Sequence, residues 1–358
     1  MIKQWTLPAL FFQSVCRNLS GRLFFRLTAF CLSLFFRTFA ANLHVMVLEI
    51  ILIIVGIAVV LWGADRFTDG ATGLARRLKV SELVIGLTVV ALGTSLPEFM
   101  VSFMSVLRGS SDMSVGNIIG SNVFNILVIL GASAIMRTMK VEKTLLRRDI
   151  PICLAVSALL YAFAVSENLI TRWEGLFLVA FFCAYLYMAY RIALKDRKDT
   201  ASPAPSQGGE KSLWWSLLLV LVGMAALVIG GHVLVNNAAA VAREWGVKES
   251  VIGATILAGG TSLPELATSV IAARKGSLGL AFGNVIGSNV FNIAFVIGTC
   301  SSIVPMAVTE INQLDWLMLV DSCIFVWVVA FTRRELCRWE GILLVLCYLG
   351  YLVSLLMK

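Results

Sequence analysis

The residues best able to do chemistry in this chain are two glutamates that end a repeated, otherwise apolar segment. Glu98 ends VIGLTVVALGTSLPE at 84–98 and Glu265 ends VIGATILAGGTSLPE at 251–265, with 11 of 15 positions identical. Alignment of Glu98 with Glu265 defines the register between the two copies. Burying a carboxylate among apolar residues is costly, so such a group is usually retained for a function. Two matching carboxylates, one in each copy, indicate a cation site.

A second repeated segment supplies neutral oxygen ligands. GNIIGSNVFNI at 116–126 returns as GNVIGSNVFNI at 283–293, with 10 of 11 positions identical in the same register. Within each copy a serine and an asparagine stand four residues apart, on one face of a helix. These candidates are Ser121, Asn125, Ser288 and Asn292. For the other asparagines of the motif, bridging between helices is favoured over direct ligation; they are Asn117, Asn122, Asn284 and Asn289.

The prolines of the GTSLPE motif are expected to break the helices that carry the glutamates. Pro97 and Pro264 lack an amide hydrogen and clash with the helix backbone one turn earlier, which predicts breaks at 93–97 and 260–264. A break exposes backbone carbonyls, which are hard oxygen ligands suited to Na⁺ or Ca²⁺. The candidate carbonyls belong to Ala91, Thr94, Ala258 and Thr261.

The composition identifies the surroundings of this site as a lipid bilayer. Hydrophobic residues make up 59% of the 358 positions and charged residues only 14%, with a mean hydropathy of +0.90. Helices are the expected spanning element, because lipid offers no partner to an unpaired backbone group. The predicted spans are 47–67, 80–107, 114–136, 150–166, 173–192, 213–240, 247–273, 280–304, 312–332 and 339–357.

Ten spans predict an all-α polytopic membrane protein of two inverted five-helix repeats, at 46–192 and 213–358. Five crossings per copy bring the second copy into the membrane from the opposite side. An RWEG tetrapeptide before the fifth and before the tenth helix extends the duplication to the end of each copy. Inverted repeats that each carry a Gly or Pro interruption indicate a secondary transporter with its site near the midplane. The first and sixth helices, where Gly63 and Gly230 correspond, are candidates for the moving pair.

Lysine and arginine are divided unevenly between the two faces of this ten-helix core. One face holds 19 and the other holds five, namely Arg108, Arg172, Arg243, Lys248 and Lys358. By the positive-inside rule the richer face is cytoplasmic, so both ends of the core lie on the periplasmic or extracellular side of a cell inner (plasma) membrane. The Pro-, Ser- and Gly-rich segment 193–212 is then a cytoplasmic linker between the repeats.

Residues 1–45 do not fit this arrangement, because they carry five basic and no acidic residues and would have to cross the membrane. Their apolar run at 27–36 is short for a span. Three interpretations are open: a cleaved signal-like segment, an additional helix, or sequence upstream of the natural start. The last is favoured, with Met46 as the start.

The remaining composition points away from other chemistry. The net charge of +8 is mostly topological and gives no reason to expect a nucleic-acid partner. The eight cysteines form no CxxC pair and are interpreted as packing residues, so no disulfide framework, resident metal or cofactor is expected. His232 stands where the first copy has Asp65 and is interpreted as a satisfied helix residue. The expected partners are transported ions and membrane lipid, and the sequence sets no oligomeric state.

These motifs resemble those of the calcium/cation antiporter superfamily and, within it, the prokaryotic sodium/calcium exchangers. The resemblance covers residues 46–358 and rests on the GTS-x-PE and GSN-x-x-N/D motifs of two alpha repeats. It implies a Na⁺/Ca²⁺ antiporter, not an enzyme, with a calcium site made of Glu98, Glu265 and the carbonyls of Thr94 and Thr261. It also implies flanking sodium sites, made of Ser95, Ser121, Ser262 and Ser288 with the carbonyls of Ala91 and Ala258.

One departure from the family concerns Asn125 and Asn292, where several relatives, including the potassium-dependent branch, have Asp. Two carboxylates balance one Ca²⁺ or two Na⁺, and a third Na⁺ would lack a counter-charge. Potassium co-transport is therefore not expected.

Three alternatives are open from the sequence. The nearest is a calcium/proton antiporter of the same fold, in which one Glu exchanges a proton for Ca²⁺, although that branch more often has Asn before its Glu. An intramembrane aspartyl protease needs two Asp and a GxGD signature, and neither lies in the repeats. A channel filter usually comes from an oligomer, whereas one chain supplies a pseudo-symmetric site here.

Overall fold

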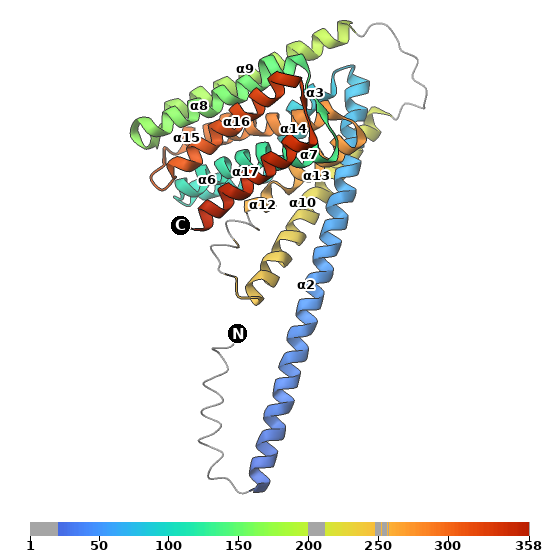
Figure 1. Ribbon diagram of the computed structural model, residues 1–358, viewed down its shortest axis with the longest axis vertical. Helices are drawn as coiled ribbons and strands as arrows, with labels where there is room; N and C mark the ends of the chain where they lie inside the picture. Colours follow the sequence, from blue (N-terminus) through green and yellow to red (C-terminus); the bar gives the residue numbers. More distant parts are fainter. Residues whose placement is uncertain (1–20, 200–211, 248–251, 253–255, 257, 358) are drawn as a thin grey trace.

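The computed structural model describes residues 21–199, 212–247, 252, 256 and 258–357 and, in the first helix, side chains from residue 46 onward. Its long elements are all helices, as the sequence predicts (Figure 1). Within the described ranges, eight helices are long and apolar enough to cross a membrane, and one bent pair makes a ninth. The start of the predicted span 247–273 and most of the predicted linker lie outside the described residues.

Most elements of the first copy follow the predicted spans with small shifts at their ends, and two helices run further than predicted. The first begins at Gly21, so residues 21–45 are helical and continuous with the predicted span, and it continues through 68–78. The fifth continues past residue 192. The helices are α2 (Gly21–Leu78), α3 (Glu82–Ile85), η2 (Gly86–Val90), α4 (Ala91–Thr94), α5 (Leu96–Leu107), α6 (Ser111–Phe124), η3 (Asn125–Ile129), α7 (Leu130–Met136), η4 (Leu145–Asp149), α8 (Ile150–Glu167) and α9 (Arg172–Asp199), and the strands are β1 (Met139–Lys140) and β2 (Leu169–Ile170).

The second copy repeats this order wherever it is described. Its helices are α10 (Leu213–Glu244), α12 (Ala258–Thr261), α13 (Leu263–Lys275), α14 (Leu278–Val290), η6 (Phe291–Ile297), α15 (Gly298–Ile303), α16 (Gln313–Arg333) and α17 (Arg338–Leu356), and its strands are β3 (Met306–Ala307) and β4 (Glu335–Leu336). The segments labelled η are π-helical, with a widened turn.

Helices α2 and α10 pack against each other through glycines. A Cβ atom on Gly63 would lie 2.9 Å from the Cβ of Ala226, and one on Gly223 would lie 2.5 Å from the backbone nitrogen of Phe67. Gly70 meets α10 equally closely, which explains why α2 stays helical beyond its predicted end. In Figure 1 the lower parts of both helices extend away from the remaining bundle. This close backbone contact makes α2 and α10 one packing unit, called the α2–α10 unit below.

The centre of the bundle is formed by the two spans that carry the GSN motif. In Ser111–Met136 and Leu278–Ile303, 72% and 94% of the most apolar stretch is buried, against 11–39% in the other six complete spans. Polar groups in these central helices are therefore shielded from both lipid and water. They have to bond to other protein groups or to bound ions.

Two short antiparallel strand pairs join the two halves of the chain. β1 pairs with β4, with Met139 opposite Leu336, and β2 pairs with β3, with Leu169 opposite Ala307. Each pair takes one strand from each half, so its backbone hydrogen bonds tie the halves together. These strands were not predicted from the sequence, because a two-residue segment has no detectable period.

Candidate functional site

The helix breaks place both glutamates in the first turn of a helix. The segments on either side of Ser95, between α4 and α5, are bent by 47°. Ser95 has φ −86° and ψ 8°, and Ser262, between α12 and α13, has φ −87° and ψ 9°. Pro97 and Pro264 occupy the start of the resumed helices, where a missing amide hydrogen is tolerated. The predicted breaks are therefore confirmed.

Each glutamate is held by a serine from the other copy. Ser95 Oγ donates a hydrogen bond to Glu265 Oε1 at 2.8 Å, and Ser262 Oγ donates to Glu98 Oε1 at 3.0 Å. Both carboxylates are buried, with exposed fractions of 1% for Glu98 and 0% for Glu265. Two carboxylates from opposite halves of the sequence thus share one site between the copies.

Four asparagines of the GSN motifs form a hydrogen-bond network between the central helices. Asn122 Nδ2 donates to the carbonyl of Asn289 at 3.2 Å, and Asn289 Nδ2 donates to the carbonyl of Asn122 at 3.1 Å. Asn125 Nδ2 donates to Asn289 Oδ1 and Asn292 Nδ2 donates to Asn122 Oδ1, both at 3.0 Å. The bridging role predicted for Asn122 and Asn289 is confirmed. Asn125 and Asn292 use their amide hydrogens in this network and keep their own oxygens available.

Buried oxygen atoms without a partner coincide with predicted ligands. Among the described residues, six such atoms come from the predicted set: Oε2 of Glu98 and Glu265, Oγ of Ser121 and Ser288, and Oδ1 of Asn125 and Asn292. A buried polar atom left without a partner costs about 1–3 kcal/mol. The described residues contain no cluster of three His, Cys, Asp or Glu side chains suited to a transition metal. Carboxylate, hydroxyl and amide oxygens instead suit Na⁺ and Ca²⁺.

The other predicted ligands lie at the helix breaks. Thr94 is buried, and its hydroxyl donates to Asn284 Oδ1 at 3.0 Å. The carbonyl of Ala91 accepts the amide of Ser95 at 3.1 Å, which leaves it one lone pair. Ala258 begins α12, but its environment lies outside the described residues.

Two further contacts hold the site together. They confirm the bridging predicted for Asn117 and Asn284, whose serine partners were not predicted. Asn117 Nδ2 donates to Ser102 Oγ at 3.0 Å and Asn284 Nδ2 donates to Ser269 Oγ at 2.9 Å, so in each copy the GSN helix is attached to the glutamate helix. The two pairs coincide in the register of the copies, which was a signal available in the sequence. The π-helical turn that begins at Asn125 in η3 had no such signal, because apolar residues surround it on both sides.

A cavity of about 840 Å³ lies beside the segments that carry the glutamates, on one side of the site. Its lining includes Pro97, Thr261 and Pro264 beside the carboxylates, together with the stretch 227–235 of α10. Met100 and Met113, which also line the cavity, are 54% and 63% exposed. The cavity therefore reaches the surface of the molecule.

The opposite side of the site is closed. The register that aligns the two glutamates relates five cavity-lining residues to positions in the other copy: Met100, Val101, Met113, Gly231 and Val235 correspond to Ala267, Thr268, Leu280, Ala64 and Thr68. In the second set the exposed fraction is 9% for Ala267 and 0% for the other four. At these five positions one side of the site lines a cavity and the other is packed, while Leu61, the counterpart of the cavity-lining Val228, is 50% exposed.

Comparison with known proteins gives relatives along most of the chain. The family model described as "Sodium/calcium exchanger protein" matches residues 48–191 and 215–357. The putative antiporter CaxA of Alkalimonas amylolytica is 35% identical over 320 residues, which cover 86% of this chain and 98% of that protein. The inner membrane protein YrbG of Escherichia coli is 35% identical, covering 87% and 97%. The sodium/calcium exchanger MaX1 of Methanosarcina acetivorans is 32% identical, covering 85% and 97%.

The fold has a counterpart among solved structures. The sodium-calcium exchanger NCX_Mj, soaked with 10 mM Na⁺ and 10 mM Sr²⁺, matches with a TM-score of 0.75 and 29% identity, over 87% of this chain and 99% of that one. The apolar helices define a multi-pass membrane protein, and the matching family and relatives are exchangers, so the chain is a transporter and not an enzyme. The chain belongs to the sodium/calcium exchanger family.

Proposed function

We propose that this chain exchanges Na⁺ for Ca²⁺ across the membrane by alternating access, with both ions competing for the site between Glu98 and Glu265. The observation that carries the proposal is the pairing of each glutamate with the serine that precedes the other glutamate. It brings two negative charges into one buried site, which one Ca²⁺ or two Na⁺ would neutralise. Family membership and the likeness to an exchanger soaked with Na⁺ and Sr²⁺ support the same ions.

The ligands divide into a central set and a flanking set. Calcium would be held by the carboxylates of Glu98 and Glu265 and by the carbonyls of Thr94 and Thr261. Sodium would also use neutral oxygens on either side, from Ser95, Ser121, Ser262, Ser288, Asn125 and Asn292 and from the carbonyls of Ala91 and Ala258. The unpartnered Oγ and Oδ1 atoms of the second set support this division.

Coupling between the two ions follows from the cost of an empty site. Without cations, two buried carboxylates have no counter-charge, and closing the site over them is expensive. Either filled state removes that cost, so movement of the α2–α10 unit past the rest of the bundle is permitted only with ions bound. The free energy of one gradient is thereby transferred to the other ion.

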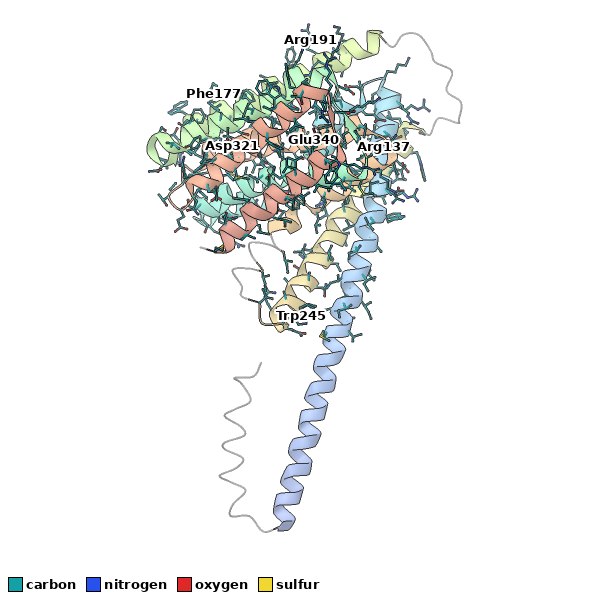
Figure 2. All side chains as sticks on the ribbon, in the orientation of Figure 1. Arg137, Phe177, Arg191, Trp245, Asp321 and Glu340 are labelled. Carbon is teal, nitrogen blue, oxygen red and sulfur yellow. The ribbon has the colours of Figure 1, made fainter. Side chains whose placement is uncertain are left out.

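We infer that the helices form two inverted five-helix repeats, 46–192 and 213–358, joined by the linker 193–212. The strand pairs between the halves support this arrangement, as do the matching helix breaks. The lysine and arginine distribution assigns the closed side of the site to the cytoplasm. In Figure 2 Arg137 and Arg191 both lie to the right of Phe177, which supports a common face for these two basic segments. Both ends of the ten-helix core then lie on the periplasmic or extracellular side of the inner membrane.

Transport by the purified protein tests this function. Proteoliposomes loaded with Na⁺ and diluted into Na⁺-free medium should accumulate radiolabelled Ca²⁺, and vesicles without an outward Na⁺ gradient should not. A pH gradient without Na⁺ is the parallel condition. Uptake that needs only the proton gradient would overturn the proposal.

A further inference from the structure

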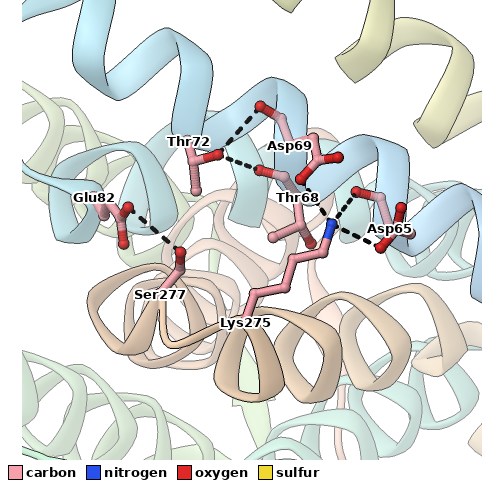
Figure 3. A network of polar contacts seen from close by, with 7 residues as sticks. All are labelled: Asp65, Thr68, Asp69, Thr72, Glu82, Lys275 and Ser277. Atoms are coloured by element: carbon pink, nitrogen blue, oxygen red, sulfur yellow. Dashed lines mark hydrogen bonds and ion pairs between the residues drawn. The ribbon is translucent and has the colours of Figure 1, made fainter. Parts of the chain in front are cut away.

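A lysine on a glutamate-bearing helix joins α13 to α2 on the closed side of the site. Lys275 Nζ donates to Asp69 Oδ1 at 2.7 Å and to the carbonyl of Asp65 at 3.0 Å, and it lies 2.7 Å from Asp65 Oδ1 (Figure 3). Three oxygens from about one turn of α2 thus surround one ammonium group. Glu265 lies in the first turn of α13, and α2 is part of the α2–α10 unit. The contact therefore connects the ion site to the unit proposed to move.

The corresponding contact on the open side is missing. In the register of the two copies, Lys275, Asp65 and Asp69 correspond to Arg108, His232 and Asn236. Both acids are replaced by residues that cannot serve as counter-ions to an arginine, and these two bond to each other, with Asn236 Nδ2 and His232 Nε2 2.9 Å apart. In the described part of the chain, Arg108 forms no ion pair. His232 instead lines the open cavity.

We propose that Lys275, Asp65 and Asp69 form an ion-pair latch that holds the cytoplasmic side shut and makes the outward-open state the favoured one. The proposal rests on the alternating access inferred above. Sliding of the α2–α10 unit breaks the latch. In a symmetric transporter an equivalent ion pair would form on the other side at the same moment, and it would offset the free energy lost when the latch breaks. Here Arg108 would meet His232 and Asn236, which carry no negative charge, so the inward-open state gains no compensating ion pair.

The size of the effect follows from the exposure of the latch. The Lys275 side chain is 30% exposed, and those of Asp65 and Asp69 are 39% and 34% exposed. Partly solvated ion pairs contribute modestly, so removing the latch should change the ratio of inward-open to outward-open protein by about three- to tenfold. Lys275 is thus a positioning residue, which sets how readily the site opens to the cytoplasm without touching the ions.

The orientation of the protein is measured by labelling single cysteines in an otherwise cysteine-free chain. Met113→Cys reports on the open cavity, and Thr68→Cys reports on the corresponding buried position in α2. A membrane-impermeant thiol reagent is applied to right-side-out and inside-out vesicles. With Lys275→Gln, cytoplasmic labelling at position 68 should rise about three- to tenfold and outside labelling at position 113 should fall. Lys275→Arg should restore the original pattern.

Two further variants separate the latch from a general effect of charge or folding. Arg274→Gln removes the neighbouring positive charge on α13 and should leave both labelling rates unchanged. His232→Asp combined with Asn236→Asp gives Arg108 its missing counter-ions and should also favour the inward-open state while Lys275 stays intact. Unchanged labelling in this double variant or in Lys275→Gln, or an equal shift in Arg274→Gln, would overturn the latch.

Transport measured in the same vesicles distinguishes failure of the latch from failure of the proposed exchange function. Sodium-driven uptake of radiolabelled Ca²⁺ is measured beside the labelling. A labelling shift in vesicles whose uptake ignores Na⁺ would reject the exchange function and leave the latch standing. Sodium-driven uptake with no labelling shift would support the exchange function and overturn the latch.

Discussion

The proposed ion site is built from pairs of a serine and a glutamate that come from different halves of the chain. Neither copy holds its own carboxylate, because Ser95 bonds to Glu265 and Ser262 bonds to Glu98. The residue types and their spacing could be predicted from the repeated GTSLPE motif. The exchange of partners could not, because it depends on how the two copies pack, and nothing within one motif records that.

Replacing either glutamate by glutamine tests the shared site. Glu98→Gln and Glu265→Gln each remove one of two charges available to a buried divalent ion, so Ca²⁺ binding should weaken by about 100-fold or more. Isothermal titration of the detergent-solubilised protein measures this change. Glu174→Gln is the control, since the Glu174 carboxylate accepts the Thr171 amide at 2.7 Å in a helix cap. Near-normal calcium affinity in both site variants would show that Ca²⁺ is not bound between the two glutamates, which contradicts the proposed mechanism.

The asparagines at 125 and 292 have a structural role as well as a proposed ligand role. Because Asn125 Nδ2 donates to Asn289 Oδ1, an aspartate at position 125 has no hydrogen to give and leaves that oxygen without a partner. Asn125→Asp should therefore lower the free energy of unfolding by about 1–3 kcal/mol. Thermal melting in detergent measures this loss.

Asn237→Asp is the matched control for that substitution. Among the described residues Asn237 Nδ2 donates to the carbonyl of Val233 on its own helix, at 2.6 Å, so the change should cost less. Equal melting temperatures for Asn125→Asp and the unmodified protein would show that the network between the central helices adds no stability.

At the scale of helices, the breaks at Ser95 and Ser262 determine where the carboxylates point. The prolines made these breaks predictable, since the loss of an amide hydrogen acts within the sequence motif itself. The π-helical turns in η3 and η6 and the extension of α2 were not predictable. They depend on contacts with helices distant in the sequence, such as the approach of Gly70 to α10.

Restoring the missing amide tests whether a break is needed for transport. In Pro97→Ala the new amide can bond to the carbonyl of Gly93, which favours a continuous helix and turns Glu98 away from Ser262. Sodium-driven Ca²⁺ uptake should fall at least about tenfold, because Glu98 no longer meets Ser262. Pro151→Ala is the control, because Pro151 lies within Leu145–Ser166, which is one span without a break. Full uptake by Pro97→Ala would show that transport does not need the helix break at Ser95.

At the scale of the whole molecule, the described contacts between the halves lie in the bundle and not in the linker. The strand pairs, the asparagine network and the serine–glutamate pairs all join one copy to the other. The duplication and the membrane class could be predicted from composition and repeats. These joints could not, because each pairs residues that belong to different copies.

Splitting the chain in the linker tests how far these joints suffice. Residues 1–199 and 212–358 produced together from separate genes should assemble, because the interactions between the halves do not need the connecting peptide. Co-purification through a tag on one half, followed by sodium-driven Ca²⁺ uptake, measures assembly and activity. Tagged halves that never recover their partner would show that the linker is needed to hold the copies in register.

The strand pairs also constrain the order in which parts of the protein can fold during its synthesis. β1 and β2 leave the ribosome with the first half of the chain, but their partners β4 and β3 are made only near its end. Until then the first half has strands without their partners, and before Ser262 is made Glu98 lacks its hydrogen-bond donor. The two copies can therefore join fully only after most of the second half has been synthesised.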